Sequence, residues 1–332
     1  MTVSSLLVCD DSNMARKQLL RALPTDWPVS VEQASDGREA MEVLRRGPVD
    51  VMLLDLTMPE MDGYQVLTAL RAEGLACKVI VVSGDVQEQA RERVMALGAL
   101  AFLQKPVEPA LLKQTLGNLS LLASAGGSEL AQARQLDASI SFFDAFREVV
   151  NVAMGRAAAL LARVLGVFVQ LPVPNVNLFE VGELHMALAD AQRGNGLTAV
   201  CQGFIGDGIA GEALLIFHDS EVDDMARLMH GFSADYAPME MLLDLSAVLI
   251  GACLAGIAEQ VDVHFSQSHP TVLGQHASID ELTRLNQPRW KRTLAVEISY
   301  SIEGHHIHFD LLLLFTEDSV ELLTHKLDYL MN

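Results

Sequence analysis

The sequence predicts two α/β domains in tandem: a doubly wound, five-stranded parallel sheet, followed by a pseudo-twofold domain made of two related halves. Three observations predict this. The chain has 332 residues and 50% hydrophobic content, which is enough for two separate cores. Up to about residue 120, short apolar runs alternate with amphipathic stretches. Two segments of the second half also align with each other at an offset of 98 residues, with Phe217 on Phe315.

The first domain is expected to span residues 1–122. Its five short apolar runs are separated by helical patterns of ten or more residues. A parallel sheet with helices on both faces produces this alternation, because its strands are buried on both sides. The five predicted strands are SLLVC, VSVEQA, DVMLLDL, KVIVVSG and LAFLQKP.

A linker is expected at 123–138, where small and polar residues surround a Gly-Gly pair. The second domain would then occupy 139–332. A helical pattern over about 139–165 precedes extended runs at 167–171 and 178–189, two alternating strands, and a helix beginning near Ser220.

The same order of elements recurs in the second half of this domain. A predicted helix at about 239–260 leads to further strands and to a helix beginning near Asp318. Each half carries a hairpin signal, at 206–208 and at 303–304. We therefore expect two copies of one helix-plus-strands unit, with the two long helices side by side.

Charge and composition limit the function classes. With 23 basic and 43 acidic residues the net charge is −20, which disfavours nucleic acid and anionic membrane surfaces as partners. The four cysteines show no CxxC spacing, and the start of the chain lacks a secretory signal. The most apolar stretch, 245–258, is shorter than the roughly 20 residues of a spanning helix, so it is interpreted as a buried helix. The expected location is cytoplasmic, without membrane insertion.

Polar residues of the first domain fall at the carboxyl ends of its predicted strands, where sheets of this type bind ligands. They are Asp10 and Asp11, Asp55, Ser83, and Lys105. A carboxylate that accepts a phosphoryl group needs a divalent cation and donors for the phosphoryl oxygens. Asp55 is the candidate nucleophile, and the two earlier aspartates supply the oxygen ligands that Mg²⁺ prefers.

Residues 1 to about 122 resemble a CheY-type response-regulator receiver, in the segments CDD, LLDLTMPEMDG, VVSGD and LQKP. The resemblance implies a flavodoxin-like fold, with Asp55 phosphorylated by a histidine kinase. Asp10, Asp11, Asp55 and the backbone carbonyl of Thr57 would bind Mg²⁺. The resemblance also implies that Ser83 and Phe102 form the switch pair. Lys105 would contact the phosphoryl group, and the bond from Lys105 to Pro106 would be cis.

In the second domain, Asp144, Glu148 and Asn151 stand at i, i+4 and i+7 of the predicted helix, on one face. Taken alone, such a stripe is more often solvated surface than a site. The segment, with the small residues after it and the VPNV stretch at 173–176, resembles the phosphatase motif of the CheC, CheX and FliY family. That resemblance implies that Asn151 orients the attacking water and that Glu148 engages the lysine of a receiver.

The second half carries a degenerate copy of this motif. Glu240, Asp244 and Ala247 align with the three positions above, and alanine cannot orient a water molecule. One competent site is therefore expected.

The leading hypothesis is a response regulator with aspartyl-phosphate phosphatase output, controlled by phosphorylation of Asp55. Its target would be a separate CheY-like phosphorylated receiver or its own Asp55. The alternative is a non-enzymatic adaptor, in which the receiver switches the binding of a signalling partner. The residues leave open the sign of control, the kinase, and whether the chain forms a homodimer.

Overall fold

The computed structural model describes residues 5–122, 140–180, 196–229, 237–277 and 292–331. The chain divides into two compact units: Met1–Glu148 with Leu330–Asn332, and Val149–Tyr329. The division falls inside helix α6 (Phe142–Leu165).

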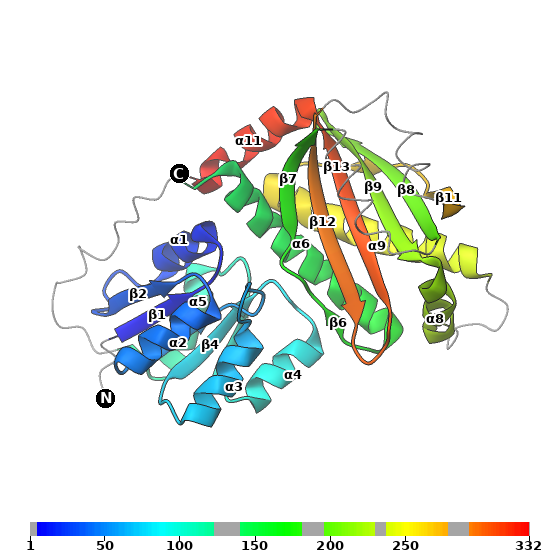
Figure 1. Ribbon diagram of the computed structural model, residues 1–332. Helices are drawn as coiled ribbons and strands as arrows, with labels where there is room; N and C mark the ends of the chain where they lie inside the picture. The colour runs from blue at the N-terminus through cyan, green and yellow to red at the C-terminus, as the bar shows by residue number, and fades with distance from the viewer. Residues whose placement is uncertain (1–4, 123–139, 181–195, 230–236, 278–291, 332) are drawn as a thin grey trace. The chain divides into compact units, whose positions relative to one another are not determined.

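The first unit contains the predicted parallel sheet, with strand order β2-β1-β3-β4-β5 (Figure 1). All neighbouring strands pair in parallel. The strands are β1 (Ser5–Cys9), β2 (Ser30–Ala34), β3 (Val51–Leu54), β4 (Lys78–Ser83) and β5 (Ala101–Gln104). The helices are α1 (Asn13–Ala22), α2 (Gly37–Arg46), α3 (Gly63–Glu73), α4 (Glu88–Ala96) and α5 (Pro109–Asn118).

The sheet separates two cores, because successive strand residues point to opposite faces. Leu6 and Val8 of β1 pack with residues of α1 and α5. Leu7 and Cys9 pack on the other face, with residues of α2, α3 and α4. Burial on both faces explains why the strands are continuous apolar runs.

The second unit is built on an antiparallel sheet with the path β10-β8-β9-β13-β12-β6; β11 also pairs with β8, and β7 with β12. The described strands are β6 (Val169–Gln170), β7 (Asn175–Glu180), β8 (Leu197–Gly206), β9 (Ile209–His218), β10 (Ser266–Gln267), β11 (Thr271–Ala277), β12 (Arg292–Ile302) and β13 (His308–Thr316). Besides α6, the described helices are α8 (Asp219–Met229), α9 (Pro238–Val261) and α11 (Glu317–Met331). The predicted extended run at 178–189 lies outside the described residues after position 180.

The predicted internal repeat is present as two halves that exchange edge strands. Strands β6 and β7 of the first half pair with β12 of the second, while β10 and β11 pair with β8 of the first. At the central pairing of β9 with β13, Leu214 lies opposite Leu312, which is its own counterpart at the offset of 98. Two equivalent residues lie opposite each other only at a twofold axis.

The two hairpins differ in length. In the β8–β9 turn, Asp207 and Gly208 both have positive φ, at 49° and 83°, as a two-residue turn of type I′ requires. The β12–β13 connection is longer than the Glu303-Gly304 signal predicts: β12 ends at Ile302 and β13 begins at His308.

The long helices α6 and α9 lie on the same face of the sheet (Figure 1). They approach closely at Gly256, where a Cβ atom would stand 2.8 Å from the Cα of Ala153. Gln260 Nε2 donates to the carbonyl of Val149 at 2.9 Å. Arg156 forms an ion pair with Glu259. The helices are therefore held by packing at one point and by polar bonds beside it.

Helix α9 is longer than its most apolar stretch suggested. It has 24 residues, and among the described residues it alone is long and apolar enough to cross a membrane, with a mean hydropathy of 2.2. Of the most apolar 18-residue stretch of this helix, 56% is buried inside the structure. A core helix of a globular domain passes the same test, and Leu242, Ile250 and Cys253 of α9 are fully buried.

Two glycines of α9 should respond oppositely to alanine. Gly256→Ala should destabilise the protein by about 1–3 kcal/mol, because the new methyl group overlaps Ala153. Gly251→Ala should stabilise it by up to about 1 kcal/mol, because alanine favours a helix interior and the nearest atom, Oε1 of Gln267, is 3.6 Å away. Urea denaturation of the full chain measures both. Equal effects would contradict the close helix contact.

Candidate functional site

The predicted acidic site is assembled at the carboxyl edge of the parallel sheet. Asp10 and Asp11 follow β1, and Asp55 follows β3. One carboxylate oxygen of each lies within 4.8 Å of the others. Asp10 and Asp55 are buried, and Asp11 is half-buried. The neighbouring strands bring these residues together although they are 45 positions apart in the chain.

Lys105, after β5, is the nearby cation. Its Nζ lies 2.8 Å from Asp10 Oδ2 and 3.3 Å from Asp55 Oδ2. Burial raises the pKa of Asp55 well above its usual range, Lys105 opposes the rise, and Asp10 and Asp11 add to it. Burial alone would lower the pKa of Lys105, but the carboxylates of Asp10, Asp55 and Glu148 outweigh it and the pKa is raised.

The donor set fits a hard divalent cation. One ammonium group faces three clustered carboxylates, which leaves an excess of negative charge in a largely buried site. Asp10 Oδ2 and Asp55 Oδ2 are both buried, and they share the Lys105 ammonium as a partner. Buried carboxylate oxygens at this spacing suit Mg²⁺, which binds through one or two carboxylates together with water.

The other predicted receiver residues border this site. Ser83 is buried at the end of β4, and its Oγ accepts a hydrogen bond from Asp85 N at 3.2 Å. Its carbonyl accepts from Lys105 N at 2.9 Å. Thr57 is half-buried in the connection after β3, and Phe102 is half-buried in β5. The bond from Lys105 to Pro106 is cis.

Sequence reasoning missed Asp85, whose buried carboxylate accepts from Gln87 N at 3.0 Å. Burial raises the pKa of Asp85 to about 6 from its ordinary 3.8. Because the folded pKa is the higher one, the stability it contributes is present at low pH and is lost as pH rises through about 6.

Asp85→Asn should remove that loss. Between pH 5 and pH 8 the variant should gain roughly 1–2 kcal/mol of stability relative to the native chain. Thermal unfolding of the full chain across this range measures the difference, with exposed Glu88→Gln as the control. A difference that does not vary with pH would contradict the buried, protonated state of Asp85.

Arg16 was also missed. This residue of α1 is buried at 9% exposure, and its guanidinium donates to the carbonyl of Asp10. A basic residue three and four positions before buried Leu19 and Leu20 was the available signal, because it falls on the apolar face of the helix.

The three motif residues of the second domain are all on α6. Asp144 has a local role: its backbone N–H donates to Ser141 Oγ at 3.1 Å, and Ser141 Oγ donates to its carboxylate at 2.9 Å. This exchange caps the start of the helix. In the described part of the chain, no hydrogen bond engages the side-chain amide of Asn151. Glu148 is buried, and its Oε1 lies 3.2 Å from Lys105 Nζ. Asn151 is therefore the motif residue whose side chain makes no bond within the described residues.

The degenerate copy lies on α9. Glu240 and Asp244 are exposed there, and Ala247 is half-buried. The structure thus has the motif positions on both long helices, while only α6 carries the amide.

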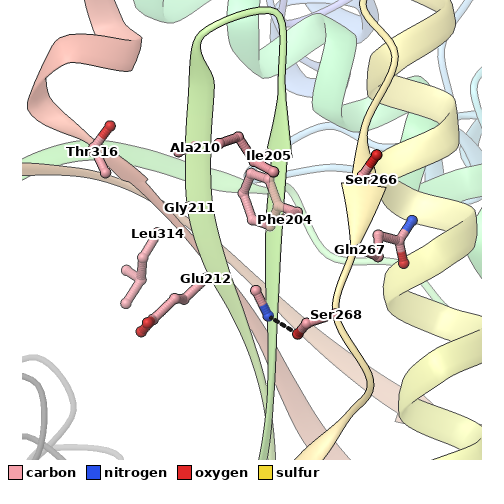
Figure 2. Close-up of a pocket in the computed structure, with 11 residues that line it drawn as sticks. Phe204, Ile205, Ala210, Gly211, Glu212, Ser266, Gln267, Ser268, Leu314 and Thr316 are labelled. Atoms are coloured by element: carbon pink, nitrogen blue, oxygen red, sulfur yellow. Dashed lines mark hydrogen bonds between the residues drawn. The ribbon is translucent and has the colours of Figure 1, made fainter.

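A cavity of about 510 Å³ lies elsewhere in the second unit, beside the β8–β9 hairpin (Figure 2). Phe204, Ile205 and Leu314 form apolar parts of its wall, while Ser266 and Gln267 of β10 line the other side (Figure 2). Glu212 adds one carboxylate. The described lining lacks a paired acid and base or a nucleophile with a base, so it does not indicate catalysis.

Comparison with known proteins agrees with the first-domain geometry. Residues 6–117 match the response regulator receiver domain family. The sensor histidine kinase RcsC of Escherichia coli is 34% identical over 111 residues, 33% of this chain and 12% of that protein. The response regulator MprA of Mycolicibacterium vanbaalenii is 37% identical over 103 residues, 30% of this chain and 43% of that protein. The chain thus spans less than half the length of these relatives.

Two solved structures are similar to parts of this chain. The crystal structure of Thermotoga maritima FliY is 19% identical, with a TM-score of 0.43 over 57% of this chain and 98% of that chain. Vibrio cholerae CheY4 is 28% identical, with a TM-score of 0.33 over 35% of this chain and 98% of that chain. The five-stranded sheet, its acidic edge and the family match agree: residues 6–117 form a response regulator receiver domain.

Proposed function

We propose that this chain is a response regulator whose output is an aspartyl-phosphate phosphatase. The receiver (1–122) accepts a phosphoryl group on Asp55 from a histidine kinase, with Mg²⁺ bound. A linker (123–138) joins it to the phosphatase domain (139–332). The target is a CheY-like phosphorylated receiver, either a separate protein or the chain's own Asp55. The proposed location is the cytoplasm.

The observation that carries the proposal is the state of Asn151. Its amide makes no hydrogen bond within the described residues, although its helix is anchored on both sides of it. Val149 and Val150 before it and Ala153 after it are fully buried, so α6 is immobilised by packing. A rigid helix that presents an uncommitted amide supports a role in holding a water molecule.

The chemistry requires little more than this. An acyl phosphate is already reactive, so a correctly placed water supplies most of the remaining acceleration. An amide holds that water without adding negative charge beside the phosphoryl group, which a carboxylate would repel. Glu148, one helical turn before Asn151, would pair with the lysine of the target receiver.

On the receiver side, Asp55 is the proposed nucleophile. Mg²⁺ would be held by Asp10, Asp11, Asp55 and the carbonyl of Thr57, and would neutralise charge on the phosphoryl group when bound. Lys105 already lies 3.3 Å from Asp55, where it can pair with a phosphoryl oxygen. Ser83 and Phe102 would register phosphorylation as the switch pair.

A non-enzymatic adaptor is the second candidate. It is favoured by one observation, the loss of the amide at Ala247 in the second repeat. In that case the domain binds a signalling partner, and receiver phosphorylation changes the binding.

The deciding experiment follows the decay of a purified, phosphorylated CheY-like receiver with and without this chain. The phosphatase accelerates the decay at catalytic, substoichiometric amounts of the chain. The adaptor leaves the decay rate unchanged while a pull-down still recovers the receiver. Repeating the assay after treatment of the chain with acetyl phosphate and Mg²⁺ tests control by Asp55.

A further inference from the structure

The buried guanidinium of Arg16 connects three elements beside the acidic site. It donates through one terminal nitrogen to the carbonyl of Asp10, and through the other to Oδ1 of Asn13. Its Nε donates to Oε1 of Gln33 at 3.2 Å. The turn after β1, the start of α1 and strand β2 are thus joined by one side chain.

All three acceptors are neutral oxygens. Within the described part of the chain, Arg16 has no ion pair with a carboxylate. Burying a cation on neutral partners is costly, and a structural arginine is normally paired with an acid. The acidic cluster that begins at Asp10 is the nearby negative charge. We therefore attribute the burial of the Arg16 cation to its position beside this cluster.

The hydrogen bonds around Asp10 indicate how Arg16 affects the orientation of the two aspartates. Asp10 N donates to the carbonyl of Ala34 at 3.1 Å, and its Oδ1 accepts from Ser12 N at 3.0 Å. Its Oδ2 faces Lys105 at 2.8 Å. The Asp10 carbonyl would otherwise be free to turn with the peptide plane, and rotation of that plane moves Asp11. Arg16 holds the plane that joins the two aspartates.

We propose that Arg16 is a positioning residue of the receiver site, which fixes the Asp10–Asp11 peptide so that both carboxylates face a divalent cation with Asp55. The inference deepens the proposed function and rests on its cation site. Arg16 does not touch the cation. Residues that hold metal ligands in place typically account for a 10–100-fold difference in affinity when they are replaced.

The test is calorimetric titration of the full chain with MgCl₂. Arg16→Met keeps the length and burial of the side chain but removes every donor, and should weaken Mg²⁺ binding about tenfold. Arg16→Lys keeps the charge and can keep one bond to the Asp10 carbonyl. Its dissociation constant for Mg²⁺ should therefore lie between those of the native chain and of Arg16→Met. Arg21→Met, on the exposed side of the same helix, should bind Mg²⁺ like the native chain.

Thermal unfolding without Mg²⁺ is measured for each variant to separate positioning from folding. A lower unfolding temperature with unchanged Mg²⁺ affinity in Arg16→Met would overturn the inference, because it would make Arg16 a structural residue only. If Arg16→Met does not fold, the inference rests on Arg16→Lys alone, and native affinity in that variant overturns it. Failure of the native chain to bind Mg²⁺ would instead refute the proposed cation site itself.

Discussion

Asn151→Ala is expected to abolish the acceleration of receiver dephosphorylation, returning the decay to its spontaneous rate. Alanine has no group to hold the attacking water, and loss of a positioning contact costs about 10²-fold or more. The assay measures the decay of a phosphorylated CheY-like receiver with equal amounts of native and variant chain. The substitution breaks no hydrogen bond within the described residues, because none engages the Asn151 amide.

Two other positions on α6 provide controls. Asp144→Ala removes the carboxylate that accepts a hydrogen bond from Ser141 Oγ, and should lower stability by at most about 1 kcal/mol while leaving the dephosphorylation rate near the native value. Arg163→Ala, exposed in the last turn, should change neither. If Asn151→Ala still accelerated decay like the native chain, the amide would have no catalytic role, and the phosphatase mechanism would fail.

Asp55→Asn is expected to eliminate phosphorylation of this chain. The amide is not a phosphoryl acceptor, and the substitution also removes one of the three carboxylates proposed to hold Mg²⁺. Incorporation of labelled phosphate from acetyl phosphate, with Mg²⁺ present, measures the effect. The native chain should be labelled, and chelation of Mg²⁺ by EDTA should prevent the labelling.

The matched control is Asp26→Asn, an exposed aspartate of the same domain, which should be labelled like the native chain. Native-level labelling of Asp55→Asn would place the phosphoacceptor elsewhere. The same variant also tests coupling: phosphatase activity that responds to acetyl phosphate in the native chain should not respond in Asp55→Asn.

Much of the architecture could be predicted from local pattern. The five apolar runs of the first domain became the five parallel strands, because burial on both faces leaves a signal that does not depend on distant residues. The helices expected near Ser220 and Asp318 begin at Asp219 and Glu317. The β12–β13 loop was harder to predict, because a single Gly304 does not specify loop length.

The acidic site was predictable for the same topological reason. Parallel strands end at a common edge, so Asp10, Asp55 and Lys105 had to meet once the strand order was known. Arg16 and Asp85 were not predicted, because each acts through burial. Arg16 resembles a surface helix residue until the contacts with Asp10 and Gln33 are seen, and Asp85 resembles a loop acid until its burial is known.

The sequence by itself determined the order of the elements, the two related halves and the residue types at the acidic edge. These follow from periodicity, internal similarity and strand direction, which are properties of neighbouring residues. Only the tertiary structure decided that the halves exchange β6 and β7 for β10 and β11, that α6 meets α9 at Gly256, and that Arg16 supports Asp10. Short edge strands can pair with any compatible neighbour, so the sequence does not specify which strand they join. Whether a side chain is buried depends on residues that are far away in the chain.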